Sequence, residues 1–148
     1  MRNEAAALAT AALGLTAGAL LAEAAVVIPW WRTLTPQAFF DWYAANTSRL
    51  FWFYGPLEAV SAVLVFVTAV LVRDRYFVLA LLLSVAVLAL FPLYFERVNA
   101  SFEAAAIDPG ELATVLAQYE RWHWVRTLLG IGAFAAAVLG LRARGRAG

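Results

Sequence analysis

Four long apolar runs, separated by shorter polar segments, dominate the pattern along the chain. They cover about 5–28, 53–72, 76–95 and 124–141. A helix that crosses the apolar part of a bilayer needs about 17–25 residues, so each run is long enough or nearly so. The pattern predicts an all-α, four-helix transmembrane bundle, with residues 1–148 forming a single integral membrane domain.

Short helices are predicted in the polar segments on the side of the bundle away from the termini. Thr35 and Pro36 are suited to a helix N-cap and first helical position, and an amphipathic aromatic segment follows them to about Asn46. This helix is expected to lie flat on the membrane surface or to cover the mouth of the bundle. The sequence Asp108–Glu111 has the same kind of start signal and predicts one long helix that continues through the last run.

Prolines and small residues modify this picture locally. The segment Pro29–Arg32, with a helix breaker and two interfacial tryptophans, predicts the end of the first span. Pro92 predicts a kink about one turn earlier in the third. Gly14, Gly18 and Ala22 form a stripe of small residues on the first span. Such a stripe lets another helix approach closely, within the chain or in a homo-oligomer.

The composition supports a membrane protein and excludes several kinds of chemistry. Hydrophobic residues make up 64% of the chain, well above the roughly 45–50% of soluble domains. There is no cysteine, which excludes disulfides, thiolate catalysis and thiolate metal sites. The net charge of +1, with no basic patch outside the chain ends, indicates no nucleic-acid partner. All basic residues are arginine and alanine is abundant, a coding bias typical of GC-rich bacterial genomes.

The distribution of arginine predicts the orientation in the membrane. Short segments with few acids contain Arg2, the pair Arg73 and Arg75, and the tail Arg142–Arg146. The longer segments mix arginines with acids. By the positive-inside rule, we expect a multi-pass protein of the cell membrane with both termini in the cytoplasm.

Each span also contains polar residues near its outer end. Tyr54, Glu58, Ser61 and Thr68 recur at helical spacing on the second span and predict an inward face. Glu23 lies above small residues on the first span, which favours an inward carboxylate over one that faces headgroups. On the third span, Glu96 and Asn99 either share this interior or mark the end of the helix.

A dense cluster precedes the fourth run and contains the only histidine of the chain. Trp122, His123, Trp124 and Arg126 follow one another within five positions. His123 and Arg126 are three apart and therefore share a helical face. Tryptophan and arginine also anchor helices at membrane interfaces, so the cluster is expected to serve both purposes.

Because polar groups inside membranes tend to pair, we expect these residues to meet in one site in the outer half of the bundle. The candidate catalytic residues are His123, Arg126 and Glu58, with His123 as a general base. The candidate substrate-binding residues are Glu23, Tyr54, Glu96, Asn99, Trp122 and Trp124. Two alternatives remain: a metal bound by Glu23, Glu58, Glu96 and His123, and a purely structural cluster of ion pairs.

The sequence contains, in order, Gly14–Gly18, Pro29, the segment 36–46, Asn99 and the cluster Trp122–Thr127. Together these resemble the anthrone-oxygenase-like family of small four-span membrane proteins, many of them of unknown function. The resemblance covers most of the chain through short motifs, and the cluster before the last span is its strongest part.

The resemblance implies a membrane-embedded, oxygenase-like enzyme acting on a lipophilic aromatic or quinone-like molecule. Such an enzyme needs no metal or flavin: a base makes an electron-rich anion, which reacts with oxygen directly. On this expectation His123 is the base, Arg126 and Asn99 stabilise the anion, and there is no cofactor. The alternative is a non-enzymatic membrane protein that binds a lipid or a partner complex.

Overall fold

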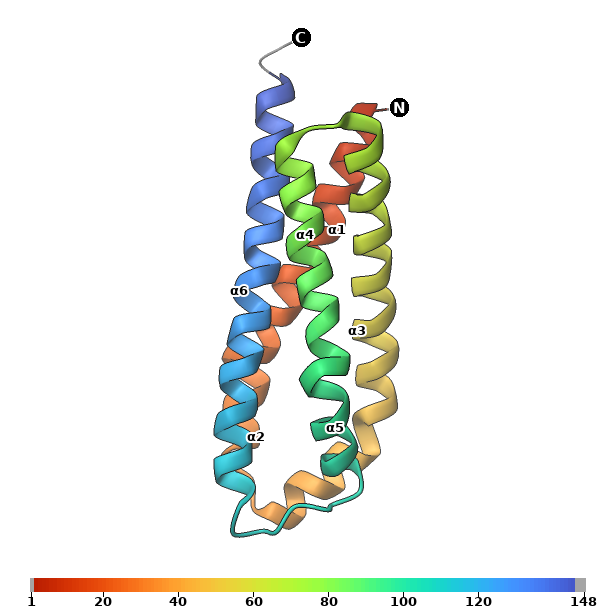
Figure 1. Cartoon of the computed structure of the whole chain (residues 1–148). Coiled ribbons are helices and arrows are strands. Elements are labelled where there is room, and N and C mark those ends of the chain that lie inside the picture. Colours follow the sequence, from red (N-terminus) through yellow and green to blue (C-terminus); the bar gives the residue numbers. More distant parts are fainter. Residues whose placement is uncertain (1, 146–148) are drawn as a thin grey trace.

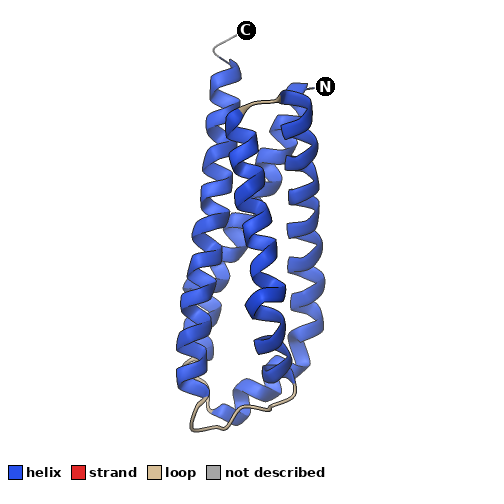
Figure 2. Ribbon diagram, in the orientation of Figure 1, coloured by secondary structure: helices blue, strands red, loops and turns tan. Residues whose placement is uncertain are grey.

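The computed structural model describes residues 2–145, which form long helices joined by short connections (Figures 1 and 2). The elements, in chain order, are α1 (Arg2–Ala22), the π-helical turn η1 (Glu23–Val27), α2 (Ile28–Trp31), α3 (Pro36–Val72), α4 (Arg75–Leu90), the π-helical turn η2 (Phe91–Phe95), α5 (Glu96–Glu103) and α6 (Leu112–Gly145). Of the predicted basic tail, Arg146 lies outside the described residues.

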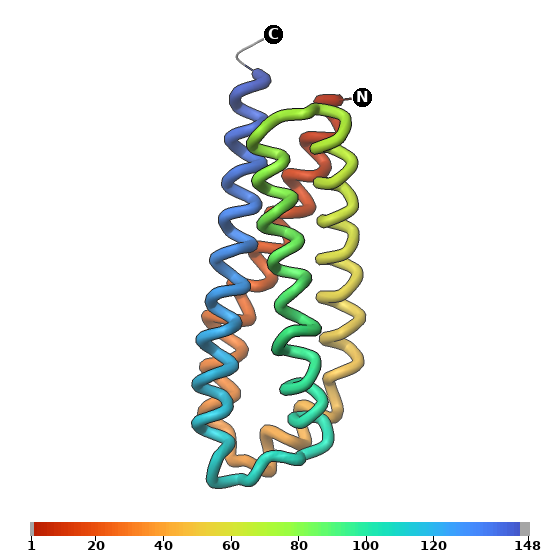
Figure 3. The backbone as a smooth tube through the Cα atoms, in the orientation of Figure 1, coloured from red at the N-terminus to blue at the C-terminus, as the bar shows by residue number. Residues whose placement is uncertain are grey.

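The helices form the predicted all-α, four-helix bundle. α1 packs against α3 and α6, and α4 packs against the same two helices. Both ends of the chain lie at one end of the bundle with the Arg73–Asp74 connection, while the other two connections lie at the opposite end (Figures 1 and 3). Within the described residues 2–145, four helical units are long and apolar enough to cross a membrane: 2–31, 36–72, 75–103 and 112–145.

Large apolar side chains point outward along the middle of the bundle. More than half of the surface of Leu15, Val63, Phe66, Leu82 and Leu128 is exposed. A bundle in water would not leave such a continuous apolar surface uncovered, whereas a bilayer solvates it favourably. The outer surface therefore fits contact with lipid.

The first span ends within the predicted segment Pro29–Arg32, although at Trp31 and not at the proline itself. Proline removes a backbone donor, and η1 ends at Val27, two residues before Pro29, with the Ile28 amide bonded to the Glu23 carbonyl five residues earlier. Pro92 lies within η2, so the helical hydrogen-bond pattern changes to a π-helical turn at this proline. Pro56 lies inside α3 without interrupting it.

The predicted short aromatic helix is not separate from the second span, because α3 runs unbroken from Pro36 to Val72. Its start is as expected: the Thr35 hydroxyl accepts a hydrogen bond from the Ala38 amide at 3.3 Å. The first turns of α3 lie across the end of the bundle before the helix rises along its side (Figure 1). α6 begins at Leu112, four residues after the predicted cap Asp108, whose carboxylate instead accepts from the Gly110 amide in the preceding turn.

The small-residue stripe on α1 is used only in part. Gly14 packs on the ring of Phe134, but a Cβ at Gly18 would meet nothing within 4 Å. A Cβ would lie 3.0 Å from the neighbouring side chain both at Gly14 on α1 and at Gly130 on α6, and only 2.7 Å from Phe77 at Gly140 on α6. Small residues thus allow tight packing on both the first and the last helix, with the closest approach at Gly140.

Two apolar clusters fill the interior, and buried polar side chains lie between them. The cluster near the termini is rich in alanine, with Leu13, Val65 and Phe77. The cluster at the other end is aromatic and includes Trp31, Phe39 and Tyr119. This arrangement places a polar layer inside a membrane-sized bundle, where an unpaired charge would be costly.

Candidate functional site

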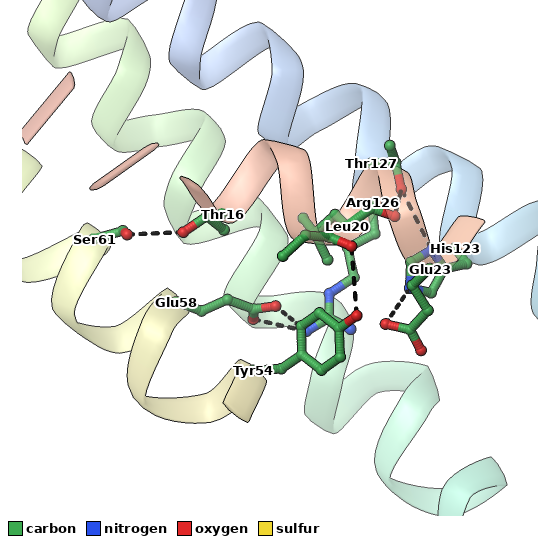
Figure 4. Close-up of polar contacts among 10 residues, drawn as sticks. Thr16, Leu20, Glu23, Tyr54, Glu58, Ser61, His123, Arg126 and Thr127 are labelled. Atoms are coloured by element: carbon green, nitrogen blue, oxygen red, sulfur yellow. Dashed lines mark hydrogen bonds and ion pairs between the residues drawn. The ribbon is translucent and has the colours of Figure 1, made fainter. Parts of the chain in front are cut away.

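The buried polar layer consists of side chains from all four helical units. Each is at most 7% exposed: Thr16 on α1, Glu23 on η1, Glu58 and Ser61 on α3, Ser84 on α4, and His123, Arg126 and Thr127 on α6. Figure 4 shows most of them directed toward one another. Thr16 and Ser61 share a hydrogen bond of 2.8 Å.

Glu58 and Arg126 form a buried ion pair between α3 and α6. Arg126 Nη2 donates to both carboxylate oxygens, at 2.5 Å to Oε1 and 2.7 Å to Oε2. The guanidinium carbon also lies 5.0 Å from the centroid of the Phe95 ring, a cation–π contact. The pair places opposite charges in contact in the interior of the bundle.

Glu23 and His123 form the second buried pair, between η1 and α6. His123 Nε2 lies 3.1 Å from Glu23 Oε2, within ion-pair distance but without hydrogen-bond alignment. The other ring nitrogen, Nδ1, lies 3.3 Å from the Thr127 hydroxyl. The imidazole has no exposed surface, so Glu23 and Thr127 are its polar contacts.

A cavity of about 550 Å³ lies beside this layer, in the half of the bundle away from the termini. Its polar wall includes Glu23, Tyr54, Glu58, Asn99 and Arg126. Its remaining lining is largely aromatic or small: Tyr43, Thr47, Ser48, Leu50, Phe51, Gly55, Leu88, Phe91, Ala100 and Tyr119, with Glu96 and Glu103. An apolar cavity of this size with a few convergent polar groups is typical of a small-molecule site.

The cavity reaches the surface between α3 and α5. Its exposed lining residues are Ser48 and Phe51 on α3, and Glu96, Ala100 and Glu103 on α5. Both π-helical turns contribute to the wall, through Glu23 in η1 and Phe91 in η2. A π-helical turn changes which side chains a helix presents and is frequent at functional sites.

Two polar atoms in the cavity wall have no hydrogen-bond partner although they are buried. They are the Nε of Arg126, a donor, and the Oδ1 of Asn99, an acceptor. Unsatisfied buried polar atoms are costly and therefore rare. A molecule that occupies the cavity could satisfy both atoms if it carried an acceptor oxygen and a donor group.

The structure brings most of the predicted site residues together. Glu23, Tyr54, Glu58, Glu96, Asn99 and Arg126 all line the cavity. His123 does not line it but lies behind Glu23. Trp122 and Trp124 are 39% and 36% exposed and lie outside the lining, and Trp122 packs on Tyr94 with the ring centroids 5.4 Å apart.

Several lining residues were not selected from the sequence. Tyr119 is one turn before His123 on the same face, so helical spacing could have identified it. Tyr43 belongs to the amphipathic segment up to Asn46, which was expected either to lie on the membrane surface or to cover the mouth of the bundle. Phe51 and Glu103 carry no sequence signal that separates them from neighbouring aromatic and acidic residues at the interface.

The four proposed metal ligands are not gathered into one group. Among residues 2–145, no three histidine, cysteine or acidic side chains lie close enough together to hold a metal ion. Glu58 pairs with Arg126, Glu23 contacts His123, and Glu96 lies at the exposed mouth of the cavity.

Comparison with family models, with curated proteins and with solved structures gives no significant match. The resemblance to the anthrone-oxygenase-like family therefore stays a prediction that rests on the short motifs of the sequence.

Proposed function

We propose that the protein lies in the cell membrane with both termini in the cytoplasm and the cavity in the outer half of the bilayer. The distribution of arginine supports this orientation. The positions of the chain ends and of the Arg73–Asp74 connection at the same end of the bundle are consistent with it.

Within this orientation, we propose that the cavity binds a lipophilic aromatic or quinone-like molecule and that the protein acts on it as an oxygenase-like enzyme. The observation that carries the proposal is the position of Glu23, a buried carboxylate that faces an aromatic-lined cavity and contacts a histidine behind it. A carboxylate in this position can remove a proton from a ligand in the cavity, and the histidine can then accept that proton from the carboxylate.

In this mechanism Glu23, not His123, is the residue that meets the ligand. Glu23 removes a proton from an activated C–H group between aromatic rings, and His123 Nε2 then receives it. The Nε of Arg126 donates to the ligand oxygen on which negative charge develops, since it is a buried donor without another partner. His123, which the sequence suggested as the base, is a positioning and proton-holding residue.

The anion left on the ligand is electron-rich and reacts with dioxygen as the oxidant. A carbon–oxygen bond forms, the peroxide takes back the proton, and loss of water leaves a ketone. One dioxygen is consumed for each CH₂ group converted to C=O, and one water is released. The resemblance of the motifs supports this choice of chemistry, and the protein's own groups supply only proton transfer and charge stabilisation.

Oxygen uptake by the purified protein with anthrone as the probe tests this function. We expect ketone formation and oxygen consumption in equal amounts. Glu23→Gln should lower the rate at least about 100-fold, because general-base catalysis contributes about 10²–10⁴. Glu120→Gln is the matched control, since Glu120 is also an ion-paired carboxylate but lies outside the cavity lining. Equal rates for Glu23→Gln and Glu120→Gln would contradict the mechanism.

A non-enzymatic role is the second candidate. The charges of Glu58 and Arg126 in the cavity wall are already matched to each other, which favours a cavity that holds a lipid or other lipophilic molecule without changing it. Mass spectrometry of molecules that co-purify with the protein separates the candidates. A tightly held ligand recovered unchanged, together with no oxygen uptake on anthrone, would support the binding role.

A further inference from the structure

The buried hydroxyl of Thr127 does not bond back to its own helix backbone. Such hydroxyls commonly bond back to the carbonyl one turn earlier on their own helix. Thr10 and Ser84 do so, both at 2.8 Å. Thr127 instead donates across to the Leu20 carbonyl of α1, at 3.3 Å, and also contacts His123 Nδ1.

The number of hydrogens available at Thr127 decides how these contacts are made. A hydroxyl has one hydrogen to donate, and a carbonyl can only accept. The arrangement that satisfies both contacts has Thr127 donating to Leu20 and accepting from an N–H at Nδ1 of His123. If Thr127 instead donated its only hydrogen to Nδ1, no hydrogen would remain for its contact with the Leu20 carbonyl.

The second ring nitrogen supports the same arrangement. His123 Nε2 is 3.1 Å from Glu23 Oε2 but is not aligned as an N–H donor toward it. The hydrogen bond made by one imidazole nitrogen sets which nitrogen of the neutral ring carries the hydrogen. Thr127 makes that hydrogen bond here, inside a site with no exposed imidazole surface.

We propose that Thr127 is a positioning residue that keeps the hydrogen of the neutral His123 ring on Nδ1, and thereby leaves Nε2 free to receive a proton from Glu23. A hydrogen already on Nε2 would block that transfer. The use of this arrangement in catalysis rests on the proposed function, whereas the position of the hydrogen does not.

The single histidine makes the position of the hydrogen directly measurable. Nitrogen-15 NMR of histidine-labelled protein in detergent at neutral pH, without substrate, distinguishes the two ring nitrogens by their couplings to the ring protons. We expect Nδ1 to show the chemical shift of a protonated nitrogen in the wild-type protein. In Thr127→Val, which keeps the branched shape, the Nδ1–H loses its acceptor and its signal should be lost in favour of a protonated Nε2.

Two further variants separate this role from general packing. Thr127→Ser keeps a hydroxyl and should restore the wild-type spectrum. Thr68→Val is the matched control: Thr68 is also fully buried and donates across to α1, to the Ala5 carbonyl at 3.1 Å, but contacts no histidine. Its spectrum should equal that of the wild type.

A wild-type ring with an unprotonated Nδ1 would overturn the proposal, as would a Thr127→Val spectrum identical to the wild type. If Thr127→Val does not fold, the wild-type and Thr127→Ser spectra decide, because both must show a protonated Nδ1. Oxygen uptake on anthrone is measured separately, so a protein with the expected spectrum and no turnover would contradict the proposed function alone.

Discussion

A single nitrogen of Arg126 contacts both carboxylate oxygens of Glu58, with Nη2 at 2.5 Å from Oε1 and 2.7 Å from Oε2. Arginine–carboxylate pairs are frequently two-pronged, with two nitrogens that each meet one oxygen. The arrangement here leaves the Nε side of the guanidinium unpaired within a residue that lines the cavity. The same side chain can therefore neutralise Glu58 and also donate to a ligand.

This geometry predicts that Arg126→Lys separates the two roles. The ammonium group can replace the one nitrogen that meets Glu58, so the fold and its thermal stability should be nearly retained. The donor at Nε is lost, and a hydrogen bond to a charged group contributes about 1.5–3 kcal/mol. Ligand affinity should fall about 10–100-fold. Titration with an anthrone-type ligand, followed by tryptophan fluorescence, measures it, and unchanged affinity would remove Nε from the binding site.

Removal of the charge should have a different effect. In Arg126→Met the Glu58 carboxylate stays buried without a partner, which typically costs about 3–5 kcal/mol of the free energy of unfolding. Adding Glu58→Gln in the same chain should recover much of this loss. The control is Arg32→Met, because the Arg32–Glu120 pair is partly exposed and such pairs contribute about 0–1 kcal/mol. Unfolding in detergent, followed by circular dichroism, measures the free energy of unfolding of each variant. Equal losses for Arg126→Met and Arg32→Met would contradict the prediction that the buried pair contributes more than the partly exposed one.

The orientation in the membrane has a direct test. Reporter fusions after Gly145 and within the 104–111 connection at Gly110 should report opposite sides of the membrane, with the first in the cytoplasm. The two sites lie at opposite ends of the bundle (Figure 1). Reporters on the same side would be incompatible with four spans, and opposite sides with Gly110 in the cytoplasm would reverse the orientation that the arginines predict.

The fold could be predicted from sequence because the constraint is simple: long apolar runs in a membrane must be helical. The ends of the helices were harder to predict. Pro29 is a helix breaker by its covalent structure, yet the helix continues past it to Trp31, just after the π-helical turn η1. No local pattern in the sequence predicts a π-helical turn.

The site could be predicted as a set of residues but not as a set of contacts. Helical spacing indicated the inward direction of Glu58 and Arg126, and their pairing followed from charge. Helical spacing alone could not show that Glu23 lines the cavity and that His123 does not. That difference depends on the relative depth and rotation of η1 and α6, which are far apart in the sequence. Trp122 and Trp124 were grouped with His123 by proximity in sequence, but neighbouring positions on a helix face different directions.

Packing on α6 gives the last prediction. A Cβ at Gly140 would lie 2.7 Å from the ring of Phe77, which is fully buried and has little room to move. Gly140→Ala should therefore lower stability by about 1–3 kcal/mol, the usual cost of overpacking, although alanine is the better helix former. Gly18→Ala is the matched control, since its methyl group would meet nothing within 4 Å and should be neutral or stabilising. Thermal unfolding of both variants in detergent measures the difference. Equal stability of Gly140→Ala and Gly18→Ala would contradict the close contact between Gly140 on α6 and Phe77 on α4.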